Sequence, residues 1–353
     1  MTTTTPVRTV EHAAPPRASL VEWLRRPRAA LNPPVWLRWT VGLGSAAALL
    51  ALPLVNPSYI NQTVTLVMIW TIVGLGLNLL VGFGGQVSLG HSAFFAMGAY
   101  SVALAGQAGW PHPLTLVVAG AVPFVIGYLI GLPALRLKGL QLGLVTLAMA
   151  IATPSAIRAM GDLTRGNRGI AIDADPPAWV ALEHDQWVFY LALACAGIAY
   201  LVTRRLGRGR LGRSFVAVRD AELVAETLGV DVWQTKTRLF AASAVYAGVA
   251  GGLYALLLEF IGPENFGLAM SISFVTLIVV GGLATVPGAV LGALFVQYVP
   301  TWTSALSTSA TGVTYGVVLM VFAFFVPYGL VGLLRGILAP AVDRLPGRRP
   351  GRA

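Results

Sequence analysis

Polar side chains and glycines interrupt two apolar runs between residues 74 and 100, GLGLNLLVGFGGQVSLGHSAFFAMGAY. Such groups can hydrogen-bond a polar solute or allow close backbone approach. Non-helical backbone at membrane depth is tolerated only where protein or a water-filled cavity satisfies its amides, and polar side chains there tend to mark a passage. We predict that a translocation pathway is lined or supported by Asn78, Gly84, Gly85, Gln86, Ser88, Gly90 and His91. The alternative is a tight cytoplasmic hairpin that packs two helices through small residues.

The sequence contains no pattern for catalysis, metal binding or nucleotide binding. Neither of its two lysines, Lys138 and Lys236, is followed by Ser or Thr, so a GxxxxGK[ST] loop is absent. The histidines are scattered, and the single cysteine, Cys195, lies inside an apolar run. All 14 acidic residues fall in tails, loops or at the edges of apolar runs, whereas proton-coupled carriers usually need ionisable groups within the bilayer. We therefore predict a transporter without a cofactor of its own that takes its energy from a partner.

Composition indicates a membrane protein. The chain has 353 residues, of which 56% are hydrophobic and 11% are charged, and its mean hydropathy is +0.75. Soluble domains are typically about 25% charged, so a soluble enzyme is excluded. We predict an all-α, polytopic transmembrane helical bundle of about 8–11 spans with broken helices. The ten spans that the pattern favours are 38–55, 60–82, 91–107, 113–133, 139–160, 187–203, 237–259, 270–282, 286–300 and 311–334.

The net charge of +10 is distributed as expected for a membrane protein rather than for a nucleic-acid binder. Arginines gather in residues 204–236 and in the C-terminal tail, whereas residues 161–186 carry a mixture of arginine, aspartate and glutamate. Because cytoplasmic loops carry an excess of Lys and Arg, both termini and residues 204–236 should be cytoplasmic and residues 161–186 should face outward across the plasma membrane. The predicted regions are a disordered arm (1–35), a transmembrane domain (36–337) and a basic tail (338–353).

A short helix is predicted inside the cytoplasmic loop, from Asp220 to Gly229 (DAELVAETLG). Asp220 is a good N-cap, Glu222 suits the first turn, and Gly229 suits the C′ position. A short helix needs a tertiary partner, either the protein's own helix ends or another protein, and the isolation of this helix favours the second. We predict a coupling role for Arg213, Arg219, Asp220, Glu222, Val224, Ala225, Glu226, Leu228 and Gly229.

Residues 271–293 repeat the pattern of the first interruption. An apolar run leads to the Gly281–Gly282 pair, a short break follows, and a second helix of small residues begins. Corresponding interrupted segments are a common signature of transporters built from two related halves. We therefore predict that the chain contains a duplicated half.

Four motifs resemble the permease subunits of branched-chain amino acid ABC transporters, the LivH/LivM family, and the length favours the LivM-like branch. They are GLNLLVGFGGQVSLGHSAFFAMGAY (76–100), LTRGNRGI (163–170), the segment from 212 to 255, and VVGGLATVPGAVLGA (279–293). They follow the family's order between about residues 60 and 334. Three departures stand out: Arg165 and Arg168 replace small or neutral residues, the residues before Gly229 match the Glu-Ala-Ala coupling pattern only loosely, and Ala284 and Val286 stand where small glycine-rich residues are common.

The resemblance implies an importer with two permease subunits, as a hetero- or homodimer, two cytoplasmic ATP-binding subunits and an extracytoplasmic solute-binding protein. The expected function is translocation of leucine, isoleucine and valine, with ATP used by the partner subunit. Related permeases serve urea or short amides, and a membrane scaffold that binds ligand without transport is a further alternative. A neutral hydrogen-bonding path would suit an amino acid and urea equally.

Overall fold

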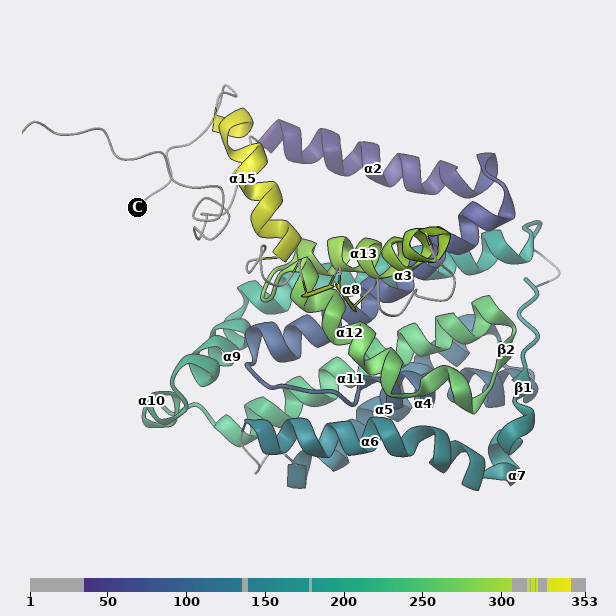
Figure 1. The fold of residues 1–353 in the computed structure, drawn as a ribbon, viewed down its shortest axis with the longest axis horizontal. Coiled ribbons are helices and arrows are strands. Elements are labelled where there is room, and N and C mark those ends of the chain that lie inside the picture. Colours follow the sequence, from purple (N-terminus) through teal and green to yellow (C-terminus); the bar gives the residue numbers. More distant parts are fainter. Residues whose placement is uncertain are drawn as a thin grey trace, which may run out of the picture.

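The computed structural model describes residues 35–134, 139–177, 180–306, 316–317, 319–320, 322 and 329–343. The described chain forms a bundle of helices that run mostly along one direction (Figure 1). The long helices are α2 (Val35–Val55), α3 (Ser58–Leu77), α4 (His91–Gln107), α5 (His112–Ala134), α6 (Leu140–Ala159), α8 (His184–Arg208), α11 (Val232–Leu258), α12 (Leu268–Gly281), α13 (Val286–Leu306) and α15 (Gly329–Asp343). The all-α, polytopic bundle predicted from composition is confirmed.

Among the described residues, six helical segments are long and apolar enough to cross a bilayer. They are Ser58–Phe83, His112–Pro133, Gln141–Ala159, His184–Arg208, Val232–Leu258 and Pro263–Gly281. Three other predicted spans correspond to α2, to the 17-residue α4 and to α13. The tenth, 311–334, lies mostly outside the described residues, as do the predicted arm and most of the basic tail. The chain is a multi-pass membrane protein.

Helix α11 lies at the centre of the bundle and packs against α4 and α5 through glycine. A Cβ atom at Gly98 would collide with the backbone of Gly248, and one at Gly251 would collide with the carbonyl of Phe95. A Cβ at Gly248 would likewise strike the carbonyl of Ala119 on α5. Small residues let helix backbones approach closely in lipid, where no hydrophobic force holds helices together. The glycines of α11 therefore set the spacing of the three helices.

We expect Gly251→Val to destabilise the bundle, because the new side chain meets the Phe95 backbone rather than a movable side-chain end. Overpacking of this kind typically costs about 1–3 kcal/mol. The midpoint of thermal unfolding in detergent measures the effect. Gly197→Val on α8 is the matched control, since a Cβ there has no neighbour within 4 Å. An equal shift in both variants would contradict the proposed packing role.

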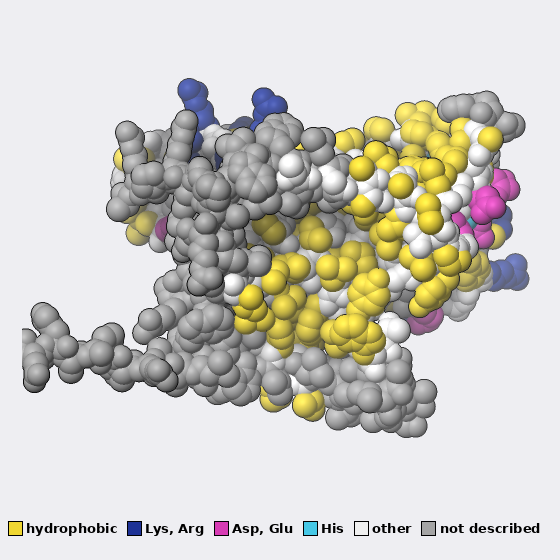
Figure 2. All heavy atoms as spheres, turned by 90° about the horizontal axis from the view of Figure 1, so that it is seen from above, with side chains coloured by type: hydrophobic (Ala, Val, Ile, Leu, Met, Phe, Trp, Pro, Cys, Tyr) yellow, Lys and Arg dark blue, Asp and Glu magenta, His cyan; other side chains and the backbone are white. Residues whose placement is uncertain are grey.

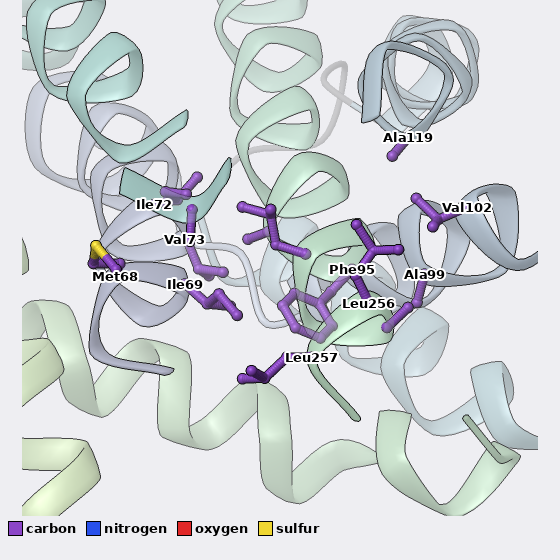
Figure 3. Close-up of a cluster of buried hydrophobic side chains, with 14 of the residues drawn as sticks. Met68, Ile69, Ile72, Val73, Phe95, Ala99, Val102, Ala119, Leu256 and Leu257 are labelled. Carbon is purple, nitrogen blue, oxygen red and sulfur yellow. The ribbon is translucent and has the colours of Figure 1, made fainter. Parts of the chain in front are cut away.

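The apolar core is formed where α3, α4, α5 and α11 meet (Figure 3). Phe95 of α4 is fully buried between Ile69 and Val73 of α3 and Leu256 of α11. Its ring also lies 5.4 Å from that of Phe274 on α12. In Figure 2 hydrophobic side chains cover the middle of the visible face, while the visible charged side chains lie toward its ends, as expected for a bilayer-spanning bundle.

The two long loops of the sequence are folded and lie at opposite ends of the bundle (Figure 1). One end carries α9 (Arg210–Asp220) and α10 (Glu222–Thr227). The other carries α7 (Gly161–Thr164), η2 (Gly166–Arg168), β1 (Ile170–Ala171), β2 (Phe260–Ile261) and η3 (Pro263–Phe266). The 204–236 segment is mostly helical, because α8 continues to Arg208 and α11 begins at Val232.

The predicted N-terminus of the short helix was wrong. Asp220 is the last residue of α9, and Ala221 is the N-cap of α10. The Asp220 carboxylate accepts a hydrogen bond from Arg219 Nε at 2.8 Å, so it does not cap the helix. The predicted C-terminus is confirmed: Gly229 has φ +82°, and Val230 N–H donates to the Ala225 carbonyl at 3.0 Å, as in a Schellman motif.

Candidate functional site

The helix that begins as α3 changes form before it ends. After α3, residues Asn78–Phe83 form the π-helix η1, and regular structure is then absent until α4 begins at His91. Gly85 has φ +65°, a conformation that side-chain-bearing residues rarely adopt, and a Cβ there would meet the side chain of Arg219. Wide π-turns inside helices are frequent at functional sites. We call residues 78–90 the first break.

The side chain of Asn78 connects the first break to a second one, residues 282–285, between α12 and α13. Asn78 Nδ2 donates to the Thr285 carbonyl at 2.7 Å, and Asn78 Oδ1 accepts from Ala284 N–H at 2.7 Å. Gly82 lies beside this contact, and a Cβ there would collide with both Asn78 and Ala284. One buried amide therefore bonds two backbone groups of the second break; the Thr285 carbonyl also accepts from Gly288 N–H at 3.1 Å.

We expect Asn78→Ala to lower the free energy of unfolding, because it leaves Ala284 N–H without its partner and removes one of the two donors to the Thr285 carbonyl. A buried polar group without a partner costs about 1–3 kcal/mol. Asn78→Asp should also be destabilising, since a second carboxylate oxygen would face the Thr285 carbonyl. Thermal unfolding of both variants measures this, with Asn56→Ala as control because the Asn56 side chain donates to the Leu52 carbonyl one turn away. Wild-type stability of Asn78→Ala would contradict a stabilising role for the two Asn78 hydrogen bonds, which we call the Asn78 clamp.

His91 is hydrogen-bonded at both ring nitrogens. Nδ1 lies 3.0 Å from Ser88 Oγ, and Nε2 lies 3.2 Å from Ser243 Oγ on α11. The Ser243 hydroxyl donates to the Phe240 carbonyl at 2.8 Å, so it must accept from His91 Nε2–H. The Ser88 hydroxyl is then placed to donate to His91 Nδ1. This histidine ties the end of the first break to α11.

Two further hydrogen bonds tie the same junction to α6 and α12. Leu89 N–H donates to Thr146 Oγ1 at 3.0 Å, and Ser92 N–H donates to Ser271 Oγ at 3.1 Å. Sequence reasoning did not single out Thr146, Ser243 or Ser271. Hydroxyl residues are common in apolar spans, and only their spatial position beside the break distinguishes these three.

Arg219 joins the first break to the helices at the end of the bundle. Its Nη1 donates to the Gly82 carbonyl at 2.8 Å, while its Nε donates to Asp220. Glu222 of α10 forms an ion pair with Lys236 of α11 at 2.9 Å. A pocket of about 130 Å³ lies between these elements and is lined by Gly84, Gly85, Gln86, Val87, Gly139, Leu142, Val218, Arg219, Glu222 and Lys236.

The predicted coupling residues divide between two environments. Ala225 is buried with Val218 and Val232, so it packs on the protein itself and was wrongly placed on a partner-facing surface. Val224 and Leu228 are 55% and 76% exposed, and Leu223 joins them at 79%. We call Leu223, Val224 and Leu228 the α10 patch. Arg213 on α9 and Glu226 on α10 are exposed as well.

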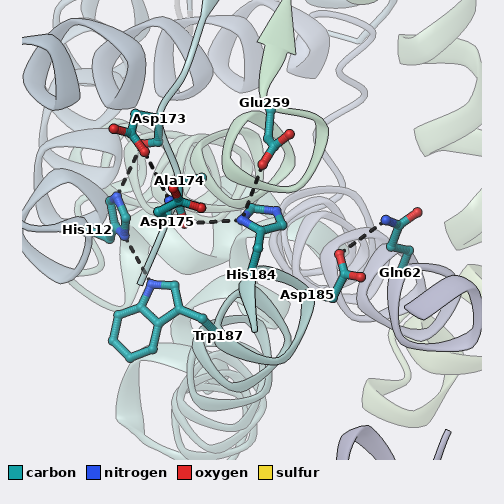
Figure 4. Close-up of polar contacts among 9 residues, drawn as sticks. All are labelled: Gln62, His112, Asp173, Ala174, Asp175, His184, Asp185, Trp187 and Glu259. Atoms are coloured by element: carbon teal, nitrogen blue, oxygen red, sulfur yellow. Dashed lines mark hydrogen bonds and ion pairs between the residues drawn. The ribbon is translucent and has the colours of Figure 1, made fainter. Parts of the chain in front are cut away.

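The opposite end of the bundle is tied together by side chains from the loop at 161–186 (Figure 4). Trp187 Nε1 donates to His112 Nδ1 at 3.0 Å, and His112 Nε2 lies 3.3 Å from the Asp173 carbonyl. His184 Nδ1 lies 3.2 Å from the Ala174 carbonyl and 3.4 Å from Glu259. β1 of the loop also pairs with β2, which follows α11, and Ile170 lies opposite Ile261. It is a folded cover at this end rather than a loose connector.

The two arginines of the LTRGNRGI motif border a hollow at this end. Arg165 and Arg168 line a cavity of about 580 Å³ together with Gly169 and Phe260. Arg165 has φ +58°, so its backbone holds a left-handed turn. Arg158 and Glu264 form an ion pair nearby.

The chain matches a known protein family over most of its length. The sequence profile described as "Branched-chain amino acid transport system / permease component" matches residues 59–326. The chain belongs to this permease family. It is 31% identical to the "High-affinity branched-chain amino acid transport system permease protein LivM" of Escherichia coli (strain K12) over 70% of this chain, and 31% identical to that of Salmonella typhimurium over 65%. It is 25% identical to the Escherichia coli LivH protein over 76% of this chain and 93% of the relative.

The matches to the two LivM relatives span 65% and 60% of those proteins. No solved structure shows a significant match to the chain. The region that matches the branched-chain amino acid permease family contains both breaks, α9, α10 and the folded loop at the opposite end. The predicted membership is therefore confirmed.

In this permease the seven predicted pathway residues do not share one surface. Gly84, Gly85 and Gln86 line the 130 Å³ pocket. Asn78 faces the second break, and Ser88 and His91 are bonded to each other at the start of α4. A Cβ at Gly90 would collide with the Thr146 carbonyl, so Gly90 permits the approach of α6. A role for these residues in the pathway stays a prediction.

Proposed function

We propose that this protein is the membrane-spanning permease subunit of an ABC importer that moves leucine, isoleucine and valine across the plasma membrane. The observation that carries the proposal is the family match over residues 59–326, which encloses every element of the candidate site. The named relatives are branched-chain amino acid transport permeases. A transport subunit rather than an enzyme fits that family.

The end that carries α9 and α10 is proposed to be cytoplasmic. Arginine is concentrated there, at Arg204, Arg205, Arg208, Arg210, Arg213 and Arg219, and cytoplasmic segments of membrane proteins carry such an excess. The α10 patch is exposed at this end and is suited to an apolar groove on an ATP-binding subunit. ATP hydrolysis by that subunit would supply the energy.

The folded loop at 161–186 is proposed to face outward and to meet a solute-binding protein. Hydrogen bonds and the β1–β2 pairing hold the loop in place, so it presents a fixed surface. A second permease subunit would complete the transmembrane part of the importer. Arg165 and Arg168 would give the outer surface a local positive charge.

Reconstitution into proteoliposomes tests the function directly. The permease is combined with its candidate ATP-binding and solute-binding subunits, and uptake of labelled leucine, isoleucine, valine and urea is measured with and without ATP inside. We expect ATP-dependent uptake of the three amino acids and no uptake by the permease alone. Uptake of urea in place of the amino acids, or assembly without uptake of any solute, would contradict the proposal.

A further inference from the structure

A wide apolar groove lies on the outer surface of the bundle, where α5 and α8 form most of its wall and α11 contributes the rest together with one residue of α3. Its volume is about 710 Å³, and no charged residue lines it. The hydroxyl of Tyr246 in this wall is already hydrogen-bonded to Thr203 at 2.9 Å. Pockets of about 300–1,000 Å³ hold drug-sized molecules, so this groove has room for a long apolar ligand.

The groove is open to the surroundings of the bundle and follows one stripe of α8. Val117 of α5 and Ile198 of α8 line it and are 65% and 62% exposed. On α8 the stripe runs from Leu191 through Ile198 to Val202, a spacing that places these residues on one face. At about 1.5 Å per residue this stretch is roughly 17 Å long. That length is close to half of a hydrocarbon core about 30 Å thick, the depth of one leaflet.

A second hollow, of about 330 Å³, adjoins the groove at the arginine-rich end of α8. Val202 lines both hollows, and Arg205 and Arg210 line the second. Both arginines are exposed, and neither forms an ion pair with any residue that the structure describes. Residues 204–219 contain no aspartate or glutamate. The positive charge of this hollow therefore calls for an anion from outside the segment.

We propose that the groove and the second hollow together bind one anionic phospholipid. An acyl chain lies along the α8 stripe from Val202 toward Leu191, and the phosphate lies between Arg205 and Arg210. Guanidinium groups bind phosphate through paired, charge-assisted hydrogen bonds. Basic pockets between spanning helices on the cytoplasmic side are a known setting for acidic lipid head groups. The assignment to the cytoplasmic leaflet rests on the orientation in the proposed function, whereas the binding of the lipid does not.

Charge complementarity favours a lipid over a helix of a second permease subunit as the occupant of the groove. Such a helix would fill the apolar part, but it would need its own acidic side chain at the level of Arg205 and Arg210. The bilayer supplies a phosphate group at the end of every acyl chain, where the apolar run of α8 gives way to arginine. One phospholipid therefore satisfies both hollows at once.

The test measures lipid selectivity on the full-length permease by native mass spectrometry. The protein is titrated with phosphatidylglycerol or with phosphatidylcholine of the same acyl chains, and the dissociation constant of the first bound lipid is compared. Wild type should bind phosphatidylglycerol about tenfold more tightly, because each arginine near an anionic head group adds attraction. Arg205→Gln/Arg210→Gln should lose this preference. Arg204→Gln/Arg213→Gln should keep it, since it removes the same charge at the same end and neither residue lines a hollow.

A second pair of variants tests the acyl-chain part of the site. Ala194 lines the groove and is exposed, so Ala194→Trp fills the groove without entering the core. It should weaken binding of phosphatidylglycerol severalfold. Leu201→Trp is the matched control, because Leu201 is exposed on the same helix and lines neither hollow. Without added lipid both variants should unfold at the wild-type temperature.

Three results would overturn the inference. Equal loss of selectivity in the two arginine pairs would show diffuse attraction rather than a site. Competition by glycerol phosphate as strong as that by the intact lipid would show an anion site without an acyl chain. A dimer of permease subunits that Ala194→Trp abolishes, with lipid binding unchanged, would assign the groove to a protein interface.

Failure of this inference differs from failure of the proposed function. Normal ATP-dependent leucine uptake, with no preference for phosphatidylglycerol, contradicts only the lipid site. Selective lipid binding by a transporter that moves no leucine contradicts only the function.

Discussion

Replacing Arg219 by alanine is expected to abolish most ATP-driven uptake while the complex still assembles and hydrolyses ATP. Arg219 belongs to α9, yet its guanidinium donates to the Gly82 carbonyl inside the first break at 2.8 Å. Asp220 holds the same guanidinium through Nε. Movement of α9 and α10 would therefore be transmitted to the first break through the Arg219 side chain. Hydrogen bonds to charged groups contribute about 1.5–3 kcal/mol, which corresponds to roughly 10–100-fold in rate.

Arg213→Ala is the matched control, because Arg213 lies on the same helix and is exposed. Arg219→Lys should restore little, since one ammonium group cannot reproduce the two directed bonds of a guanidinium. Uptake and ATP hydrolysis are measured on the same proteoliposomes, so the ratio of solute moved to ATP consumed reports coupling. Equal loss of uptake in Arg213→Ala and Arg219→Ala would show that charge, rather than the bond to Gly82, matters.

Changing Leu228 to aspartate is expected to remove the ATP-binding subunit from the purified complex. Leu223 on α10 and Leu228 at its C-cap are 79% and 76% exposed, so little of their surface is buried within the chain itself. Burial of such a side chain contributes about 1.5–3 kcal/mol, and a charged carboxylate would add a desolvation cost at the same contact. The combined change is large enough to lower affinity by roughly 100-fold or more.

Glu226→Gln is the control for charge on the same helix, because exposed ion pairs contribute only about 0.2–1 kcal/mol. Copurification of the tagged permease with its ATPase measures the effect, and thermal unfolding of the permease alone shows that the variant is folded. Full copurification by Leu228→Asp, with the permease intact, would exclude the α10 patch as the docking surface.

Local sequence signals located the first break and the end of α10 because glycine is required there by conformation. Gly85 and Gly229 both have positive φ, which few other residues adopt. Ala284 is an exception to this pattern, because it has φ +57°, a conformation in which glycine would be favoured. Its N–H bond to Asn78 helps to hold this conformation.

The failures came from contacts that capping rules and helical periodicity do not take into account. The Asp220 side chain could cap a helix, but its carboxylate accepts a hydrogen bond from Arg219 instead. The order of residues in the sequence does not show which of these two bonds forms. Ala225 lies on the apolar stripe predicted for a partner, yet Val218 and Val232 bury it within the chain. The partners of Asn78 and His91 likewise depend on where α11 and the second break lie in space.

The clamp formed by Asn78 has a consequence for how the protein is made. Its partner Ala284 is 206 residues further along the chain. At about 5–20 residues per second, translation takes roughly 10–40 s to cover that distance. During this interval α3 is synthesised with a polar amide whose partner does not yet exist, and a polar group exposed to lipid is costly. We expect the N-terminal half to stay close to the insertion machinery, or shielded by a neighbouring helix, until α12 and α13 arrive. Insertion order, and not only final packing, would then limit the yield of this chain in the membrane.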